Sequence, residues 1–143
     1  MKATELQIGD WVKIKGHLDY DKVQEIARDE NMQWYISFAC SAVLFRAYEF
    51  EPIPLTPEIL EKNGFKKIDF SHYQINDRTL VLDADGKWDG EVSWHWVVTE
   101  MSTNSKGQNV VLDYYVATLN YAHQLQHALR LCGLNELADN FKV

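Results

Sequence analysis

The chain has 143 residues, of which 46% are hydrophobic and 24% are charged, and its formal net charge is −7 at pH 7. This length predicts one domain or two small domains that share a core, and the apolar content excludes an intrinsically disordered chain. Both halves of the chain are acidic, so neither offers the basic surface on which affinity for nucleic acids usually depends. We therefore expect a protein partner of basic character and no nucleic-acid partner.

No segment of the sequence predicts insertion into a membrane. The first five residues are followed by no apolar segment of the secretory type. The longest nearly apolar run, Phe38 to Phe45, is far shorter than the roughly 20 residues that a spanning helix needs. Cys40 and Cys132 lie far apart and form no Cys-x-x-Cys motif, which favours two buried thiols in a reducing compartment. These features predict a cytoplasmic protein without a membrane partner.

Residues 1–51 have the composition of short strands joined by tight turns. Strands are expected at Trp11–Lys15, Lys22–Ala27, Gln33–Phe38 and Val43–Phe50, separated by polar turns. This pattern predicts a small β-barrel of the Src-homology or Tudor kind. The residues Ile8-Gly9-Asp10-Trp11-Val12 resemble the x-Gly-Asp-x-Val entry that is common in such barrels.

A proline-rich connector and a short helix follow the predicted barrel. Pro52 and Pro54 fix the backbone and favour an extended chain. Thr56 is placed to cap a helix that starts at Pro57, where no amide hydrogen is needed. Gly64 can adopt the left-handed conformation that ends a helix. The segment therefore predicts a helix of about two turns with both ends defined.

The remaining residues predict a second sheet followed by a C-terminal helix. Strands are expected at Ile68–Ile75, Thr79–Asp83, Glu91–Glu100 and Asn109–Leu119, with an exposed loop at Ser102–Gln108. Consecutive strands without long crossovers favour an antiparallel meander. A helix is expected to begin at Asn120 and a shorter one at Leu134. The apolar stripe around Leu125 is expected to cover Trp94 and Trp96.

Taken in order, these elements predict an α+β fold in two parts. The first part, residues 1–51, is the small β-barrel. The second part, residues 52–143, contains the short capped helix and an antiparallel β-meander covered by a C-terminal helix. The two parts form either two small domains or one compact unit.

Three stretches carry a resemblance to known proteins. They are Leu6-x-Ile8-Gly9-Asp10-Trp11-Val12, then Glu51-Pro52-Ile53-Pro54-Leu55-Thr56-x-Glu58-Ile59-Leu60 with Gly64-Phe65, and His123-Gln124-Leu125-Gln126. In this order they are similar to a group of small uncharacterised proteins of gut Bacteroidales, their prophages and their bacteriophages. The resemblance does not extend to residues 66–118. It implies a phage or mobile-element accessory protein, and it brings no activity with it.

Two histidines of the predicted C-terminal helix form a candidate metal pair. His123 and His127 lie four residues apart and therefore share one helical face. The zinc-protease motif His-Glu-x-x-His needs a glutamate as general base at its second position, where this chain has Gln124. The helical periodicity places both histidines with Gln126 and Arg130, away from the apolar stripe, so we expect a solvated polar face. No metal site, cofactor or catalytic residue is predicted.

Aromatic side chains are numerous, and most of them are expected in the core. Trp34, Tyr35 and Trp88 are the candidates for an exposed binding surface, because small barrels often receive a peptide or ligand in an aromatic groove. Exposed aromatic rings can also stack on nucleobases. A nucleic-acid or nucleotide binder is therefore one alternative function.

The sequence favours a non-enzymatic, protein-binding accessory protein of phage or mobile-element origin, which acts on a host protein through an acidic surface. The candidate binding residues are Trp34, Tyr35, Trp88, His123, Gln126, His127 and Arg130. Besides the nucleotide binder, the second alternative is a metal-binding protein or hydrolase that uses His123 and His127.

Overall fold

The computed structural model describes residues 2–17, 19–38, 41–46, 49–69, 72–76, 80–86 and 92–143. It has a mixed α+β fold with antiparallel strands and C-terminal helices, as predicted. The chain divides into two compact units. The first comprises Met1–Pro54 with Tyr121–Val143, and the second comprises Leu55–Asn120. The chain crosses between them twice, and on the side of the first unit Pro54 and Tyr121 form an isolated antiparallel bridge.

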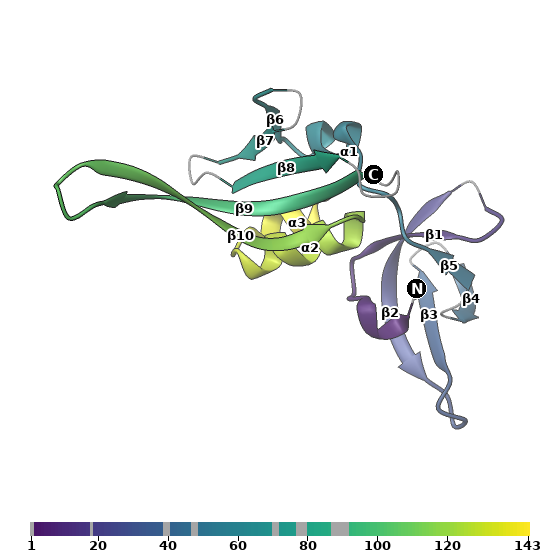
Figure 1. Cartoon of the computed structure of the whole chain (residues 1–143). Coiled ribbons are helices and arrows are strands. Elements are labelled where there is room, and N and C mark those ends of the chain that lie inside the picture. The colour runs from purple at the N-terminus through teal and green to yellow at the C-terminus, as the bar shows by residue number, and fades with distance from the viewer. Residues whose placement is uncertain are drawn as a thin grey trace. The chain divides into compact units, whose positions relative to one another are not determined.

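The first unit contains a five-stranded antiparallel sheet. Its elements are the 3₁₀ helix η1 (Ala3–Glu5) and the strands β1 (Trp11–Ile14), β2 (Tyr20–Arg28), β3 (Trp34–Phe38), β4 (Ser41–Arg46) and β5 (Phe50–Glu51). The strand order is β4-β3-β2-β1-β5 (Figure 1). The expected strands are present, and the last of them corresponds to two strands, β4 and β5, which lie at opposite ends of the sheet order.

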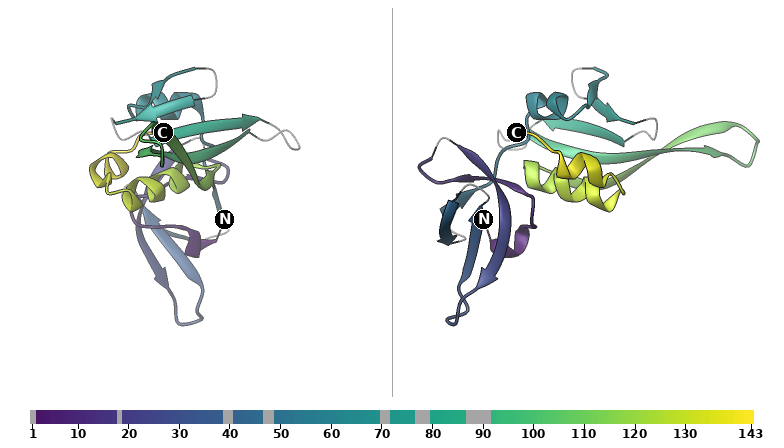
Figure 2. Two further views of the ribbon diagram at one scale, coloured as in Figure 1. Left: turned by 60° about the vertical axis from the view of Figure 1, so that its left-hand side comes forward. Right: turned by 180° about the vertical axis from the view of Figure 1, so that it is seen from behind.

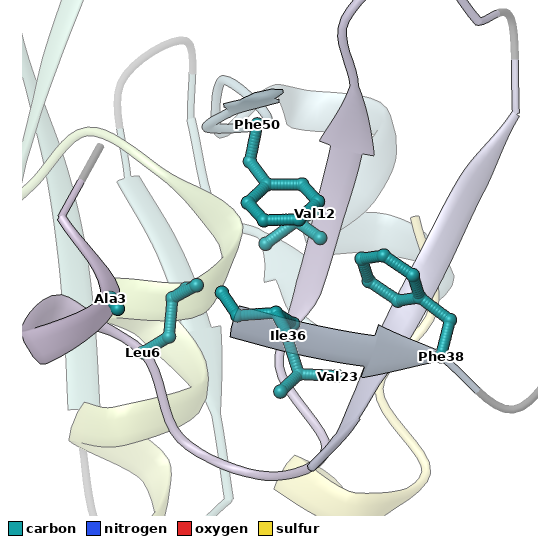
Figure 3. Close-up of a cluster of buried hydrophobic side chains, with 7 residues drawn as sticks. All are labelled: Ala3, Leu6, Val12, Val23, Ile36, Phe38 and Phe50. Carbon is teal, nitrogen blue, oxygen red and sulfur yellow. The ribbon is translucent and has the colours of Figure 1, made fainter. Parts of the chain in front are cut away.

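The long strand β2 connects two halves of this sheet. Its first residues, Tyr20 to Lys22, pair with β1, whereas the stretch from Val23 to Arg28 pairs with β3. One core lies between the two halves. It consists of Ala3, Leu6, Val12, Val23, Ile36, Phe38 and Phe50, drawn together in Figure 3. The rings of Phe38, Phe45 and Phe50 lie with centroids 5.4 to 6.1 Å apart in tilted and edge-to-face arrangements, which are favourable for aromatic rings.

The second unit begins with the predicted helix, α1 (Pro57–Lys62). The Thr56 Oγ1 accepts a hydrogen bond from the backbone N–H of Ile59 at 3.4 Å. Hydrogen bonds from the backbone and from Thr56 lower the pKa of Glu58, which agrees with a negative charge at the helix start. At the other end Gly64 has a φ of 82°, and the N–H of Phe65 bonds to the C=O of Leu60 at 3.1 Å. The predicted caps of this helix are therefore confirmed.

Replacing Thr56 by alanine is expected to lower the free energy of unfolding by about 1 kcal/mol, because the first turn of α1 loses its side-chain acceptor. Urea denaturation followed by circular dichroism measures the change. Thr56→Ser is the matched control, since it keeps the hydroxyl and should stay close to the parent protein. Equal loss in both variants would show that the methyl group of Thr56, and not the cap, is what matters.

The second unit contains an antiparallel meander, as predicted, but it has five strands where four were expected, because Lys66–Lys67 forms an additional short strand. Its strands are β6 (Lys66–Lys67), β7 (His72–Ile75), β8 (Leu80–Gly86), β9 (Val92–Thr103) and β10 (Asn109–Leu119), and their order is β10-β9-β8-β7-β6. Trp94 and Trp96 of β9 are buried and make edge-to-face contacts with Tyr73 and Phe65, respectively. The Nε1–H of Trp94 also donates to the C=O of Leu55 at 2.9 Å.

The hairpin of β9 and β10 extends beyond the rest of its sheet. Among the described residues, β8 pairs with β9 as far as Leu80 opposite Val98, whereas β10 pairs with β9 out to Asn109 opposite Thr103. The distal half of the hairpin is consequently a two-stranded ribbon, seen in green in Figure 1 and from behind in Figure 2. The predicted loop at its tip is a turn in which the N–H of Asn104 bonds to the C=O of Gln108 at 2.9 Å.

Two helices, α2 (Ala122–Leu131) and α3 (Asn135–Asp139), end the chain. The N-cap of α2 is Tyr121, one residue later than expected. The predicted second part, residues 52–143, included these helices, whereas the structure groups them with Met1–Pro54 in one compact unit. The reason is a set of hydrogen bonds and an ion pair between side chains of α2 and residues 9–11. In the part of the chain that the structure describes, no helix has the length and apolar character needed to cross a membrane.

Candidate functional site

The polar face of α2 is not the solvated surface that the sequence predicts. His123, Gln126, His127 and Arg130 do share one face, but His123 is only 4% exposed and Gln126 is completely buried. The apolar stripe on the opposite side of α2 is buried as well, since Leu125 and Leu129 have no exposed surface. Helical periodicity identifies which residues share a face, but it does not show that a distant segment covers the polar one.

Gln126 joins α2 to the start of the chain through its side-chain amide. Its Oε1 accepts a hydrogen bond from the backbone N–H of Trp11 at 3.0 Å. Its Nε2 donates to the C=O of Gly9 at 2.9 Å and to the C=O of Ala138 at 3.2 Å. One buried amide therefore satisfies three backbone groups from two other segments, which is a structural role and not a binding role.

Asp10 forms the charged centre of the same contact. Its carboxylate is fully buried and accepts from the Nη1–H of Arg130 at 3.0 Å and from the backbone N–H of Gln7 at 2.7 Å. The Nε2 of His127 lies 2.6 Å from the other side of this carboxylate. A buried carboxylate needs this many partners, because burying the charge without them would cost several kcal/mol.

Gly9 allows Arg130 to come this close. A Cβ atom at position 9 would lie 3.1 Å from the Nη2 of Arg130, and the φ of Gly9 is 88°, in the region that favours glycine. Gly9 and Asp10, which resemble the entry of a small barrel, thus also contact Arg130 of the C-terminal helix α2.

A pocket of about 530 Å³ opens beside this contact, within the first unit. Its lining consists of Glu5, Pro52, Tyr121, His123, Gln124 and His127. The Tyr121 and His123 rings stack in parallel with centroids 5.9 Å apart, and the His127 ring lies edge-on to that of His123 at the same separation. Such a volume lies within the range of small-molecule sites.

His123 differs from the other polar residues of this region. Its Nδ1 is buried and has no hydrogen-bond partner in the described part of the chain. Burial lowers the pKa of His123, the neighbouring His127 and the N-terminal amino group lower it further, and the carboxylates of Asp10 and Glu5 act in the opposite direction. The neutral imidazole is therefore the form that the folded protein favours at neutral pH.

The lowered pKa makes stability depend on pH. Because the unfolded chain binds a proton at His123 more tightly than the folded chain does, stability is lost as the pH falls through about 6.5, the usual value for an unfolded histidine. One proton contributes at most about 1.4 kcal/mol per pH unit. Unfolding curves at pH 7.5 and 5.5 should therefore show a smaller acid-induced loss for His123→Gln than for the parent protein.

The matched control for this measurement is His17→Gln, a substitution at an exposed position. It should keep the full acid-induced loss of the parent protein. An unchanged pH dependence in His123→Gln would show that the burial of His123 does not govern the titration.

The two histidine side chains have different surroundings. The Nε2 of His127 is directed at Asp10, and His123 makes ring contacts with Tyr121 and His127. Among the described residues no group of three or more His, Cys, Asp and Glu side chains has a geometry that could hold a metal ion.

The aromatic candidates lie elsewhere and are not brought together with the helix. Trp34 of β3 is half-buried and packs against the first core, and the Arg28 guanidinium lies 4.0 Å from its ring centre. Tyr35 is half-buried and pairs in register with Ala27 and Arg46. Trp88 lies outside the described residues. Trp34 and Tyr35 therefore do not line the pocket beside α2.

Sequence reasoning did not identify Glu5, Asp10, Pro52 or Tyr121 as members of this region. Two features of the sequence could have indicated Asp10. It lies between Gly9 and the start of a strand, and His127 and Arg130 share one face of the predicted helix. That combination indicates a buried carboxylate with two partners. No sequence pattern relates Glu5 and Pro52 to the helix, because the pocket depends on how three segments pack.

The comparisons with known proteins add no relative. No family model matches the sequence, and no curated protein and no solved structure matches the chain.

Proposed function

We propose that the protein is a non-enzymatic binding module that docks a protein partner on strand β10. The observation that carries this proposal is the exposed apolar surface of the β9–β10 hairpin. The exposed side chains are Met101, Val111, Leu112, Tyr114 and Val116, with exposed fractions from 38% to 70%. Met101 and Val111 are register partners on one face of the hairpin, whereas Leu112 and Tyr114 share the other face of β10. Large exposed apolar side chains gathered on one hairpin are typical of an interaction surface in a folded protein.

The backbone of β10 supports the same function. In the sheet order β10 is the edge strand, so one side of it presents N–H and C=O groups that no further strand of the described sheet pairs with. The segment Asn109–Leu119 has Asp113 as its single charged residue. Natural edge strands usually carry charges, a proline or a cover that prevents pairing. An apolar edge strand with a single charged residue favours addition of a strand from the partner.

The partner that fits is a protein with an extended apolar segment and a basic surface around it. The net charge of −7 favours encounter with a positively charged protein and disfavours a second copy of this acidic chain. The resemblance to Bacteroidales phage and prophage proteins adds the origin to the proposal: an accessory protein of a phage or mobile element that acts on a host protein.

The first sheet enters the proposal as a supporting scaffold. We infer that it is a small barrel of the Src-homology kind, because β2 divides its pairing between β1 and β3 and both halves of the sheet enclose one aromatic core. Such a scaffold positions residues 7–11 to contact the C-terminal helices. In this proposal it does not bind the partner, and strand β10 does.

The experiment compares proteins that co-purify with the tagged parent chain and with the double variant Leu112→Lys/Tyr114→Lys in cells of the natural host. A specific partner is expected to fall at least tenfold with the variant, because both lysines stand on one face of β10. The control Ile68→Lys/Leu131→Lys adds the same charge at exposed apolar positions of other segments and should retain the partner. Equal recovery with all three proteins, or no reproducible partner, would refute the proposal.

Analytical ultracentrifugation of the purified protein tests whether the chain binds a second copy of itself. A monomer is expected. A dimer that the β10 variant dissociates and the control does not would show that the edge strand binds a second copy of this chain.

A further inference from the structure

The pocket beside α2 has a chemistry different from that of the β10 surface, and it is independent of the proposed function. We propose that this pocket, lined by Glu5, Pro52, Tyr121, His123, Gln124 and His127, binds an ammonium or guanidinium group. Three segments build it: η1, the proline connector and the first two turns of α2 with its N-cap.

The charge of the lining favours a cation. Glu5 is the formally charged residue among these six, and the described part of the lining contains no lysine or arginine. The structure gives the Glu5 carboxylate one hydrogen bond, from the backbone N–H of Lys2 at 3.1 Å, so most of its acceptor capacity remains for a ligand. The nearby positive side chain, Arg130, is already paired with Asp10 at 3.0 Å.

The state of His123 is compatible with a cationic ligand. This side chain is 4% exposed, and its Nδ1 lacks a partner in the described part of the chain. A buried polar side chain without a protein partner is unusual, and a pocket beside it indicates that a ligand completes its surroundings. A neutral imidazole does not repel a cation, whereas an imidazolium would. Binding should consequently weaken when His123 gains a proton.

Charged groups from several segments act on the imidazole of His123. Glu5 approaches from η1 and Asp10 from the loop before β1, and both carboxylates favour protonation of the imidazole. His127 on the same helix and the N-terminal amino group of the chain oppose it. The Tyr121 ring, stacked at 5.9 Å, is the uncharged neighbour.

The apolar part of the lining suits the remainder of such a ligand. An aromatic ring attracts a cation placed over its face, and Tyr121 supplies that ring. The Pro52 side chain can pack against the methylene groups that carry an ammonium or guanidinium group. A lysine or arginine side chain of another protein and a free diamine share this chemistry.

Nuclear magnetic resonance titration of the intact chain tests the proposal. The probes are N-acetyl-arginine methylamide, N-acetyl-lysine methylamide and putrescine, and the neutral control is N-acetyl-citrulline methylamide, which has nearly the shape of the arginine probe. Saturable shifts of the His123 and His127 imidazole signals are expected with the cations at pH 7.5. Citrulline should bind at least fivefold more weakly. Tighter binding of the peptide-like probes than of putrescine would assign the site to a protein side chain, and the reverse order would assign it to a free amine.

Variants locate the site. Glu5→Gln should weaken the cationic probes about fivefold, because it removes the exposed carboxylate and keeps an oxygen for the Lys2 N–H. Glu25→Gln, an exposed exchange with the same change of charge, should leave binding unchanged.

Lowering the pH to 5.5 should also weaken binding of the cationic probes to the parent protein. Equal affinity for arginine and citrulline probes, no saturable shift, or equal effects of the two glutamine variants would overturn the proposal. The β10 double variant should bind the probes normally, so the two proposals fail separately.

Discussion

Replacement of Asp10 by alanine is expected to lower the free energy of unfolding by about 3 kcal/mol or more. The fully buried carboxylate holds Arg130 at 3.0 Å, the N–H of Gln7 at 2.7 Å and the Nε2 of His127 at 2.6 Å. Its removal leaves the arginine charge and a backbone N–H in a partly buried place without an acceptor. Urea denaturation at pH 7.5 measures the change.

The charge and the hydrogen bonds of Asp10 can be separated. Asp10→Asn keeps one acceptor oxygen and should cost less than alanine, while Asp19→Ala, an exposed exchange, should be nearly neutral. A cycle with Arg130→Met measures the coupling between the two side chains, expected at about 1 to 3 kcal/mol. If Asp10→Ala lowers the free energy of unfolding no more than the exposed control does, the carboxylate does not stabilise the packing of α2 against the start of the chain.

Replacement of Gln126 by leucine is expected to cost about 3 kcal/mol, although leucine has a similar volume and a higher hydrophobicity. The substitution leaves the N–H of Trp11 and the carbonyls of Gly9 and Ala138 buried without their partners. Each unsatisfied backbone group costs about 1 to 3 kcal/mol, and the three costs do not add completely. The loss should appear in urea denaturation of the whole chain.

Two further variants test the assignment of this cost. Gln126→Glu keeps the acceptor for Trp11 but turns the donor toward Gly9 and Ala138 into an acceptor, so it should destabilise at least as strongly as leucine. Gln33→Leu, at an exposed position, should stay within about 0.5 kcal/mol of the parent protein. A stable Gln126→Leu protein would mean that water or another side chain satisfies these backbone groups.

Several elements could be predicted because their signals are local. Thr56, Pro57 and Gly64 define α1 through conformational preferences and side-chain bonds that lie within one or two turns, and the structure shows the expected caps. The strands β9 and β10 follow from alternation of apolar and polar residues, and their pairing follows from a short polar loop. Local rules also located the boundary between the first and second sheets close to residue 51.

The surroundings of the C-terminal helix could not be predicted in the same way. The periodicity of α2 correctly joined His123, Gln126, His127 and Arg130 on one face, but the last three of them bond to residues more than 100 positions earlier, at Gly9 and Asp10. A polar face is equally suited to water and to a complementary buried segment, because both satisfy its hydrogen bonds.

By itself, then, the sequence determined the α+β class, the capped helix, the order of the strands along the chain and the acidic charge. Only the tertiary structure decided that the last helices belong to the first unit, that the polar face of α2 is buried, and that Glu5, Pro52 and His123 line one pocket. The physical reason is the range of the interactions. Backbone preferences and apolar periodicity act between near neighbours, whereas the choice of partner for a buried polar side chain depends on which distant segments the folded chain brings together.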